Sequence, residues 1–225
     1  MADEQAGRAP EVQIVVRPIG TPLPLGFLGL VVATTCFSAL QLGWLPAEEG
    51  GTVALGVLVF TVPAQLIAAI LGFQARDPVA GTGMGVLAGV WAAVALATYT
   101  GPPGATSPGL GVLLLAAAAA MLVPAAASLT KRVATAVMVL TSARFAVTGL
   151  AELTELGTWK SAAGVVGLVL AVVALYAALA LEIEDAKHRT VLPTWRRGTG
   201  ADALCDDPAR QAAGVAAESG VRRQL

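Results

Sequence analysis

Long apolar stretches without charged residues occupy most of the chain. Charges are absent from residues 18–47, 50–75, 78–130 and 161–181. The hydrocarbon core of a bilayer is about 30 Å thick, so a helix needs roughly 20 apolar residues to cross it. Membrane-spanning strands alternate apolar and polar residues, whereas residues 109–127 are apolar on every face of a helix. The pattern therefore predicts an all-α integral membrane protein.

Short polar or Gly-Pro-rich segments divide these stretches into six transmembrane helices. The segments 47–51 and 101–108 are interpreted as turns. The ends of the chain are polar, which gives three parts: a cytoplasmic N-terminal segment 1–20, a six-helix transmembrane domain 21–193 and a flexible cytoplasmic tail 194–225. The predicted helices are Pro24–Leu45, Thr52–Phe73, Val79–Tyr99, Gly109–Ser128, Val133–Ala151 and Ser161–Leu181.

Lysine and arginine lie almost entirely on one side of the predicted bundle. Of the 14 such residues, Arg144 lies within a span and Lys160 lies opposite the termini. Cytoplasmic loops carry the excess of basic residues, so both termini are expected in the cytoplasm. Arginine outnumbers lysine and alanine is abundant, which favours a bacterial source and a multi-pass protein of the inner membrane. The residues on the side of the termini are Arg8, Arg17, Arg76, Lys131, Arg132, Lys187, Arg189, Arg196, Arg197, Arg210, Arg222 and Arg223.

Composition excludes several classes of function. The chain is 56% hydrophobic and 13% charged with a net charge of −1, so it offers no basic surface to nucleic acid. Cys36 and Cys205 lie in different environments and His188 is the one histidine, which leaves neither a metal spacing nor a Ser-His-Asp hydrolase. The spans hold no paired carboxylates. We therefore expect no enzyme, no metal and no cofactor.

Small residues and prolines inside the spans indicate how the helices pack. Gly81, Gly85 and Gly89 recur every four residues, so they share one face that another backbone can approach closely. That face could pack within one subunit or between subunits. Pro63 and Pro124 are expected to kink their helices, and such kinks often line cavities.

Polar residues form stripes on three of the predicted helices, the first, the second and the fifth. Thr34, Ser38 and Gln41 fall on one face of the first helix, and Thr61 and Gln65 lie one turn apart on the second. Polar side chains are costly in lipid, so these faces are expected to turn inward. Serine and threonine can also bond the backbone of their own helix, whereas the two glutamine amides favour an interior path.

Arg144 is the one charge within any predicted span, and it shares a face of the fifth helix with Thr141 and Thr148. A charge at membrane depth indicates a functional site, and a guanidinium there would attract an anion. A structural partner on another helix and snorkelling toward either surface are the alternatives. Glu152 lies eight residues further along the same helix, too far to pair with it directly.

Three stretches carry recognisable motifs. Residues 21–27 read Thr-Pro-Leu-Pro-Leu-Gly-Phe, close to an Asn-Pro-x-Pro-Leu-Gly-Leu signature with threonine in place of asparagine. Residues 189–193, Arg-Thr-Val-Leu-Pro, follow Tyr176 at the spacing of a Tyr…Gly-Arg-Thr-Val-Leu-Pro ending. With the stretch 60–91 between them, they resemble the acetate uptake transporters, the YaaH/SatP-like acetate–succinate family. The matching residues of that middle stretch are Gln65, Ala68, Phe73, Gly81, Thr82, Gly89 and Trp91.

The resemblance implies a six-helix protomer in a homo-hexamer, with one narrow path per protomer. It implies small monocarboxylates such as acetate as substrates, with succinate in some members, carried by an anion channel or by proton-coupled uptake. It also places residues 21–26 at a pore mouth and makes Leu25 and Tyr176 candidates for a constriction. The expected path residues are Thr21, Pro22, Pro24, Leu25, Gly26, Thr34, Gln65, Arg144 and Tyr176.

Backbone chemistry at the signature agrees with that placement. Pro22 and Pro24 fix φ and remove two donors, so the residues before Leu25 are expected to be extended. The free N–H groups of the helix start would then favour anions.

Two other functions stay open. A urea- or amide-type channel would also have six helices and a hexamer, but its substrates are neutral, so an unpaired Arg144 in the path argues against it. A membrane scaffold or sensor would keep the fold with a closed path. Arg196 and Arg197, just beyond the last span, are expected to contact anionic lipid head groups.

Overall fold

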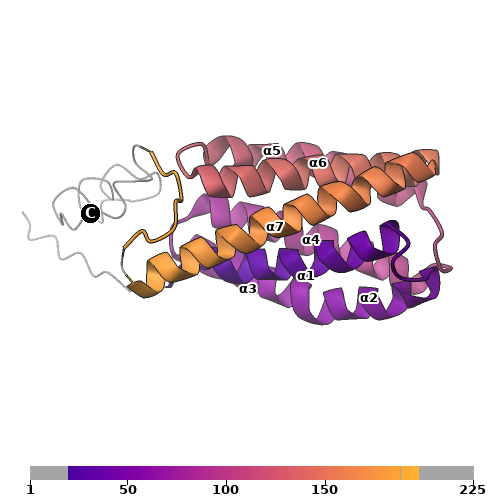
Figure 1. Cartoon of the computed structure of the whole chain (residues 1–225), viewed down its shortest axis with the longest axis horizontal. Coiled ribbons are helices and arrows are strands. Elements are labelled where there is room, and N and C mark those ends of the chain that lie inside the picture. The colour runs from indigo at the N-terminus through magenta and orange to yellow at the C-terminus, as the bar shows by residue number, and fades with distance from the viewer. Residues whose placement is uncertain (1–19, 188, 198–225) are drawn as a thin grey trace, which may run out of the picture.

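The computed structural model describes residues 20–187 and 189–197 (Figure 1). Within these residues the chain is helical and no strand forms. The predicted N-terminal segment up to residue 19 lies outside the described residues, as do His188 and the tail from residue 198 with Cys205. The elements are α1 (Leu23–Gln41), the 3-10 helix η1 (Ala47–Glu49), α2 (Gly50–Gly56), the π-helix η2 (Val57–Thr61), α3 (Val62–Gln74), α4 (Pro78–Thr100), α5 (Pro108–Ala127), α6 (Arg132–Thr154) and α7 (Gly157–Lys187).

Six helical spans are long and apolar enough to cross a membrane: α1, the run from η1 to α3 (Ala47–Gln74), α4, α5, α6 and α7. The predicted all-α fold with six such helices is confirmed. The spans lie along the long axis of one bundle (Figure 1). We call the end where α1 begins and α7 ends the base, and the opposite end the mouth.

The ends of the first and last helices differ from the prediction. α1 ends at Gln41 rather than Leu45 because the chain turns at Gly43, where φ is +72°. The expected extended backbone before Leu25 is wrong, since α1 already begins at Leu23 and Pro22 has helical angles. A helix needs no N–H donors in its first turn, so prolines fit there. α7 extends past its predicted range at both ends and finishes at Lys187.

The second span contains the irregular helix that its proline requires. Pro63 has no N–H to donate to the preceding turn, and the π-helix η2 lies just before it. At this place the Thr61 hydroxyl donates to the Gly29 carbonyl of α1 at 2.9 Å. The second span is thereby joined to the first by a hydrogen bond between helices.

Glycines allow several of the helix pairs to approach closely. A Cβ on Gly149 of α6 would lie 2.9 Å from the Gly111 carbonyl of α5, and one on Gly72 of α3 would lie 2.6 Å from the Gly81 nitrogen of α4. The interpretation of the glycine stripe as packing within one subunit is therefore confirmed at Gly81. Further along that stripe, a Cβ on Gly89 would meet nothing within 4 Å.

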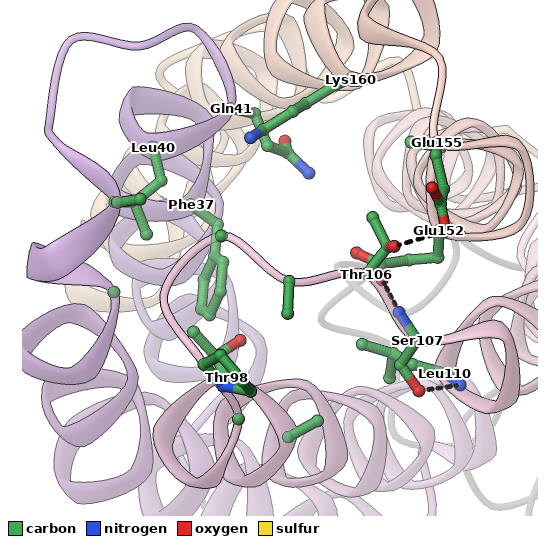
Figure 2. A pocket seen from close by; sticks show the side chains of 18 of the residues that line it. Phe37, Leu40, Gln41, Thr98, Thr106, Ser107, Leu110, Glu152, Glu155 and Lys160 are labelled. Atoms are coloured by element: carbon green, nitrogen blue, oxygen red, sulfur yellow. Dashed lines mark hydrogen bonds between the residues drawn. The ribbon is translucent and has the colours of Figure 1, made fainter.

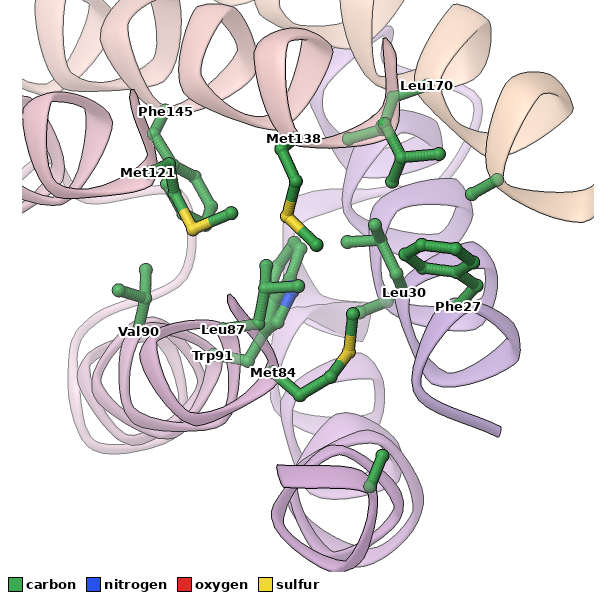
Figure 3. Close-up of a cluster of buried hydrophobic side chains, with 14 of the residues drawn as sticks. Phe27, Leu30, Met84, Leu87, Val90, Trp91, Met121, Met138, Phe145 and Leu170 are labelled. Atoms are coloured by element: carbon green, nitrogen blue, oxygen red, sulfur yellow. The ribbon is translucent and has the colours of Figure 1, made fainter. Parts of the chain in front are cut away.

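Large apolar side chains fill the middle of the bundle (Figure 3). Leu30, Met84, Leu87 and Met138 are fully buried, and we call these four side chains the core plug. They come from α1, α4 and α6, so the plug joins three separate spans.

The segment after α7 folds back over the base, and we call residues 189–197 the strap. Glu184 of α7 accepts from the Thr190 hydroxyl at 2.9 Å and pairs with Arg196. The Arg197 N–H donates to the Thr130 carbonyl at 2.9 Å, in the turn between α5 and α6. The strap thus holds the ends of three helices together.

Candidate functional site

A cavity of about 720 Å³ opens at the mouth of the bundle, and we call it the vestibule (Figure 2). Its walls come from the end of α1, the segment 45–50, the end of α4, the loop 101–107 and the facing ends of α6 and α7. Phe37 and Gln41 lie at its inner side. The vestibule is therefore built from almost every connection at this end of the chain.

Two carboxylates hold the loop 101–107 in place over the vestibule. The Ser107 N–H donates to Glu152 Oε2 at 2.8 Å, and the Thr106 hydroxyl donates to Glu155 Oε1 at 3.2 Å (Figure 2). Ser107 also caps α5, because its Oγ accepts from the Leu110 N–H at 3.3 Å. Both carboxylates of the vestibule wall are thus occupied as acceptors.

Lys160 is the one lysine or arginine among the vestibule residues of the described chain. It begins on the first turn of α7, and Figure 2 shows its amine pointing toward Gln41 at the end of α1. A cation therefore lies next to Gln41, at the inner side of the vestibule.

A second, smaller cavity of about 20 Å³ lies deeper, and we call it the inner pocket. That volume suits about one water molecule. Phe37 and Gln41 line both cavities and form the neck between them. The Phe37 ring packs on Trp91 with centroids 5.5 Å apart. The residues of the inner pocket are Phe37, Gln41, Trp91, Val94, Leu114, Arg144, Phe145 and Thr148.

Arg144 reaches the inner pocket from the middle of α6 and is only 2% exposed. Its Nη1 donates to the Ala163 carbonyl of α7. No carboxylate of the described residues forms an ion pair with it. The expected inward position is confirmed, and the structural partner on another helix, one of the alternatives left open, is the neutral Ala163 carbonyl. A buried guanidinium without a counter-charge is costly.

Gly167 of α7 provides the space that Arg144 needs. A Cβ at Gly167 would lie 2.7 Å from Arg144 Cζ and Nη1, and closer still to Ser38 Oγ of α1. Arg144 and Ser38 therefore converge on one point of the α7 backbone. The Gly167 carbonyl also accepts from the Thr34 hydroxyl at 3.2 Å.

The other threonines of the predicted stripes divide into two groups. Thr34 and Thr61 are fully buried and bond carbonyls of other helices. Thr141 and Thr148 bond their own helix, at 2.8 Å to the Val137 and Arg144 carbonyls respectively. Both alternatives left open by the sequence are therefore realised, each on a different helix.

Four buried polar atoms have no hydrogen-bond partner within the described chain: Ser38 Oγ, Gln41 Oε1, Gln65 Oε1 and Trp91 Nε1. Gln65 contacts Gly26 through its amide nitrogen at 3.5 Å. The other three lie on the neck, on the inner pocket or against Arg144. Buried polar atoms are normally paired, so this group indicates a place where a ligand or water binds.

Comparisons with known proteins bear on the fold. No protein-family model matches the sequence, and no curated protein matches it. Among solved structures, the bacterial acetate channel SatP matches with a TM-score of 0.70 and 20% sequence identity, over 79% of this chain and 99% of that one. The chain has the SatP fold. The fold implied by the motifs is confirmed, and at this identity the likeness speaks for the fold alone.

The predicted path residues lie at two levels of this SatP fold. Thr21, Pro22 and Pro24 lie at the base, where the Thr21 N–H donates to Asp185 at 3.2 Å. Gly26 is buried nearby. Thr34 and Arg144 instead meet α7 at Gly167 and Ala163, beside the inner pocket. The set is therefore not one cluster.

The two residues predicted to form a constriction have different surroundings in the SatP fold. Leu25 is 39% exposed. Tyr176 is half-buried, and its hydroxyl donates to the Pro193 carbonyl of the strap at 2.8 Å. Tyr176 also lies near Trp195, with ring centroids 6.1 Å apart. Their role as a constriction stays a prediction.

Sequence reasoning missed several residues of the neck, the inner pocket and the vestibule. Phe37, Phe145 and Lys160 were given no role, and Trp91 was noted only as a motif position. One signal was present for Phe37, because it lies one turn before Gln41 on the polar face of α1. Nothing in the sequence pattern indicated that Trp91 of α4 would meet it.

Proposed function

We propose that this protein is a membrane channel or transporter for small monocarboxylate anions such as acetate, as a member of the acetate uptake family. The observation that carries the proposal is a vestibule separated by a neck from a buried arginine without a counter-charge, in the fold of an acetate channel. Fold alone does not assign function, so the proposal depends on the residues of the site.

The charge beyond the neck suits a small anion, whereas the vestibule wall carries Lys160 together with the carboxylates of Glu152 and Glu155. Lys160 stands at the vestibule and Arg144 at the inner pocket, and Gln41 lies at the neck between them. In a low-dielectric interior, a cation without a counter-charge attracts an anion much more strongly than in water. A neutral urea or amide would leave the charge of Arg144 uncompensated, which argues against the urea-type alternative.

We place the protein in a bacterial inner membrane as a homo-hexamer with the base toward the cytoplasm and one path per protomer. The excess of basic residues at the base supports this orientation. Apolar side chains exposed along the second span, among them Phe60, Ile67 and Phe73, suit contact with lipid or a neighbouring protomer.

The chemistry of the core plug supports a proposal of coupling to protons. Leu30, Met84, Leu87 and Met138 are apolar and fully buried, so a neutral acid would pass them at lower cost than its anion. We therefore propose that uptake rises with the proton gradient. Succinate, with two carboxylates, would cross less readily than acetate.

One observation favours a second function. Met84 and Leu87 precede Trp91 on α4, so the core plug fills the bundle between the inner pocket and the base. A closed interior of this kind is what a non-transporting scaffold or sensor would keep. Transport requires the plug side chains to move.

Uptake of radiolabelled acetate into proteoliposomes, at acid outside pH and against empty liposomes, tests the proposal. We expect uptake above the control that other small monocarboxylates reduce by competition. Absence of uptake by folded protein would favour the scaffold.

A further inference from the structure

We infer that the inner pocket is a binding site for one carboxylate group, with Arg144 as its principal ligand. This inference rests on the proposed function and names its substrate site and its selectivity. It follows from the donors without acceptors, the missing counter-charge, the apolar walls and the size of the pocket.

The donors around Arg144 lack acceptors. Arg144 uses Nη1 on the Ala163 carbonyl, and its planar guanidinium has five N–H donors in all. Ser38 Oγ lies against the same point of α7, and Trp91 Nε1 belongs to a pocket residue; neither has a partner within the described chain. A carboxylate supplies two oxygens that match a guanidinium fork, which a chloride ion does not.

The single positive charge at the site favours a ligand with a single negative charge. α1, α4 and α5 contain no charged residue, and the charges of α6 and α7 other than Arg144 lie near their ends. One guanidinium therefore stands alone in the middle of the bundle. A single carboxylate would neutralise it, whereas a second carboxylate would find no cation there.

The remaining walls favour a short apolar tail. Phe37, Val94, Leu114 and Phe145 surround the pocket with hydrocarbon. A methyl or ethyl group has no desolvation cost when it packs against these side chains. The far carboxylate of a dicarboxylate would instead lose its water without gaining a partner. The site should therefore bind acetate more tightly than succinate.

The size and the apolar surface of the pocket show that binding needs a rearrangement, in which the Arg144 guanidinium turns toward the ligand. At about 20 Å³ the pocket suits one water, and acetate has four non-hydrogen atoms. Phe37 forms part of the wall between the pocket and the much larger vestibule. Rotation of this ring is the movement that we expect to join the two cavities and admit the ligand.

Thermal unfolding of the purified full-length protein, titrated with acetate, acetamide or succinate, tests the site without requiring transport. A ligand that binds the folded state raises the melting temperature with its concentration. Acetate should stabilise wild type at lower concentration than succinate, and acetamide, its neutral isostere, should have little effect. Arg144→Gln should weaken the apparent acetate affinity about tenfold or more, because it removes a charge-assisted hydrogen bond.

Arg132→Gln is the matched control, since it removes an exposed arginine from the base end of the same helix. It should leave the acetate response unchanged. Equal stabilisation of wild type and Arg144→Gln by acetate would overturn the site. So would stabilisation by acetamide at the same concentration as acetate, a result that needs no variant to fold.

Uptake measured on the same preparations separates this inference from the proposed function. Acetate uptake that is equal in wild type and Arg144→Gln would keep the function and overturn the site. Acetate binding that depends on Arg144, without uptake by wild type, would support the site and overturn the transport function.

Discussion

Gly167→Ala is the substitution whose consequence follows most directly from the structure. The added Cβ would lie 2.7 Å from Arg144 Cζ and Nη1 and closer still to Ser38 Oγ. Both neighbours are the ends of side chains, so the Ser38 hydroxyl and the Arg144 guanidinium would have to shift to make room for the new methyl group. Arg144 would then lose its bond to the Ala163 carbonyl and its place at the inner pocket.

The effect on stability combines two opposing contributions. Crowding in a packed interior costs about 1–3 kcal/mol, whereas replacing glycine by alanine inside a helix gains about 0.5–1 kcal/mol. The net change should therefore be a loss of about 0–2.5 kcal/mol. The affinity for acetate should fall about tenfold, since the charged ligand of the site is displaced.

The assay is thermal unfolding with and without acetate, followed by uptake into proteoliposomes. Gly89→Ala is the control, because a Cβ there meets nothing within 4 Å of the described chain and brings the same gain in helix propensity. Adding Ser38→Ala to Gly167→Ala removes the closest contact and should restore part of the stability. If Gly167→Ala behaves like Gly89→Ala in both assays, the assignment of Arg144 is refuted.

Three further substitutions probe the neck, the strap and a bond between spans. Phe37→Leu should widen the neck and raise the initial uptake rate. An unchanged or lower rate in folded protein would contradict the inference that the Phe37 ring separates the two cavities. Glu184→Gln should weaken its pairing with Arg196 by about 1.5–3 kcal/mol and speed tryptic cleavage in the strap, and unaltered cleavage would count against the strap's anchor. Thr61→Val should cost about 0.6 kcal/mol in thermal unfolding, through loss of its bond to Gly29; a gain in stability would oppose this.

The spans could be predicted because apolar length is a local property of the sequence. Their ends were harder to place. Leu42 to Leu45 are as apolar as the helix before them, so only the turn at Gly43 shows that α1 has ended. Pro22 was expected to keep the backbone extended, but a proline in the first helical turn loses no hydrogen bond.

The candidate site could be predicted only where one residue stood out by itself. Arg144 did, because a lone charge in an apolar span is visible in the sequence. Its surroundings were not, because Phe37, Trp91 and Gly167 come from α1, α4 and α7 and meet only in the folded bundle. The partners of the threonines could not be predicted either, because a threonine hydroxyl can donate to a carbonyl of its own helix or of a neighbouring one. Thr34 donates to Gly167 of α7, whereas Thr141 donates to Val137 of its own helix.

The central claim is that a small carboxylate anion crosses the protomer by way of Arg144. Uptake of labelled acetate and of labelled acetamide, measured side by side in proteoliposomes holding wild type or Arg144→Gln, tests it most directly. We predict acetate uptake by wild type, a strong reduction in the variant and little acetamide uptake in either. Faster uptake of acetamide than of acetate, or equal acetate uptake by wild type and Arg144→Gln, would contradict the account.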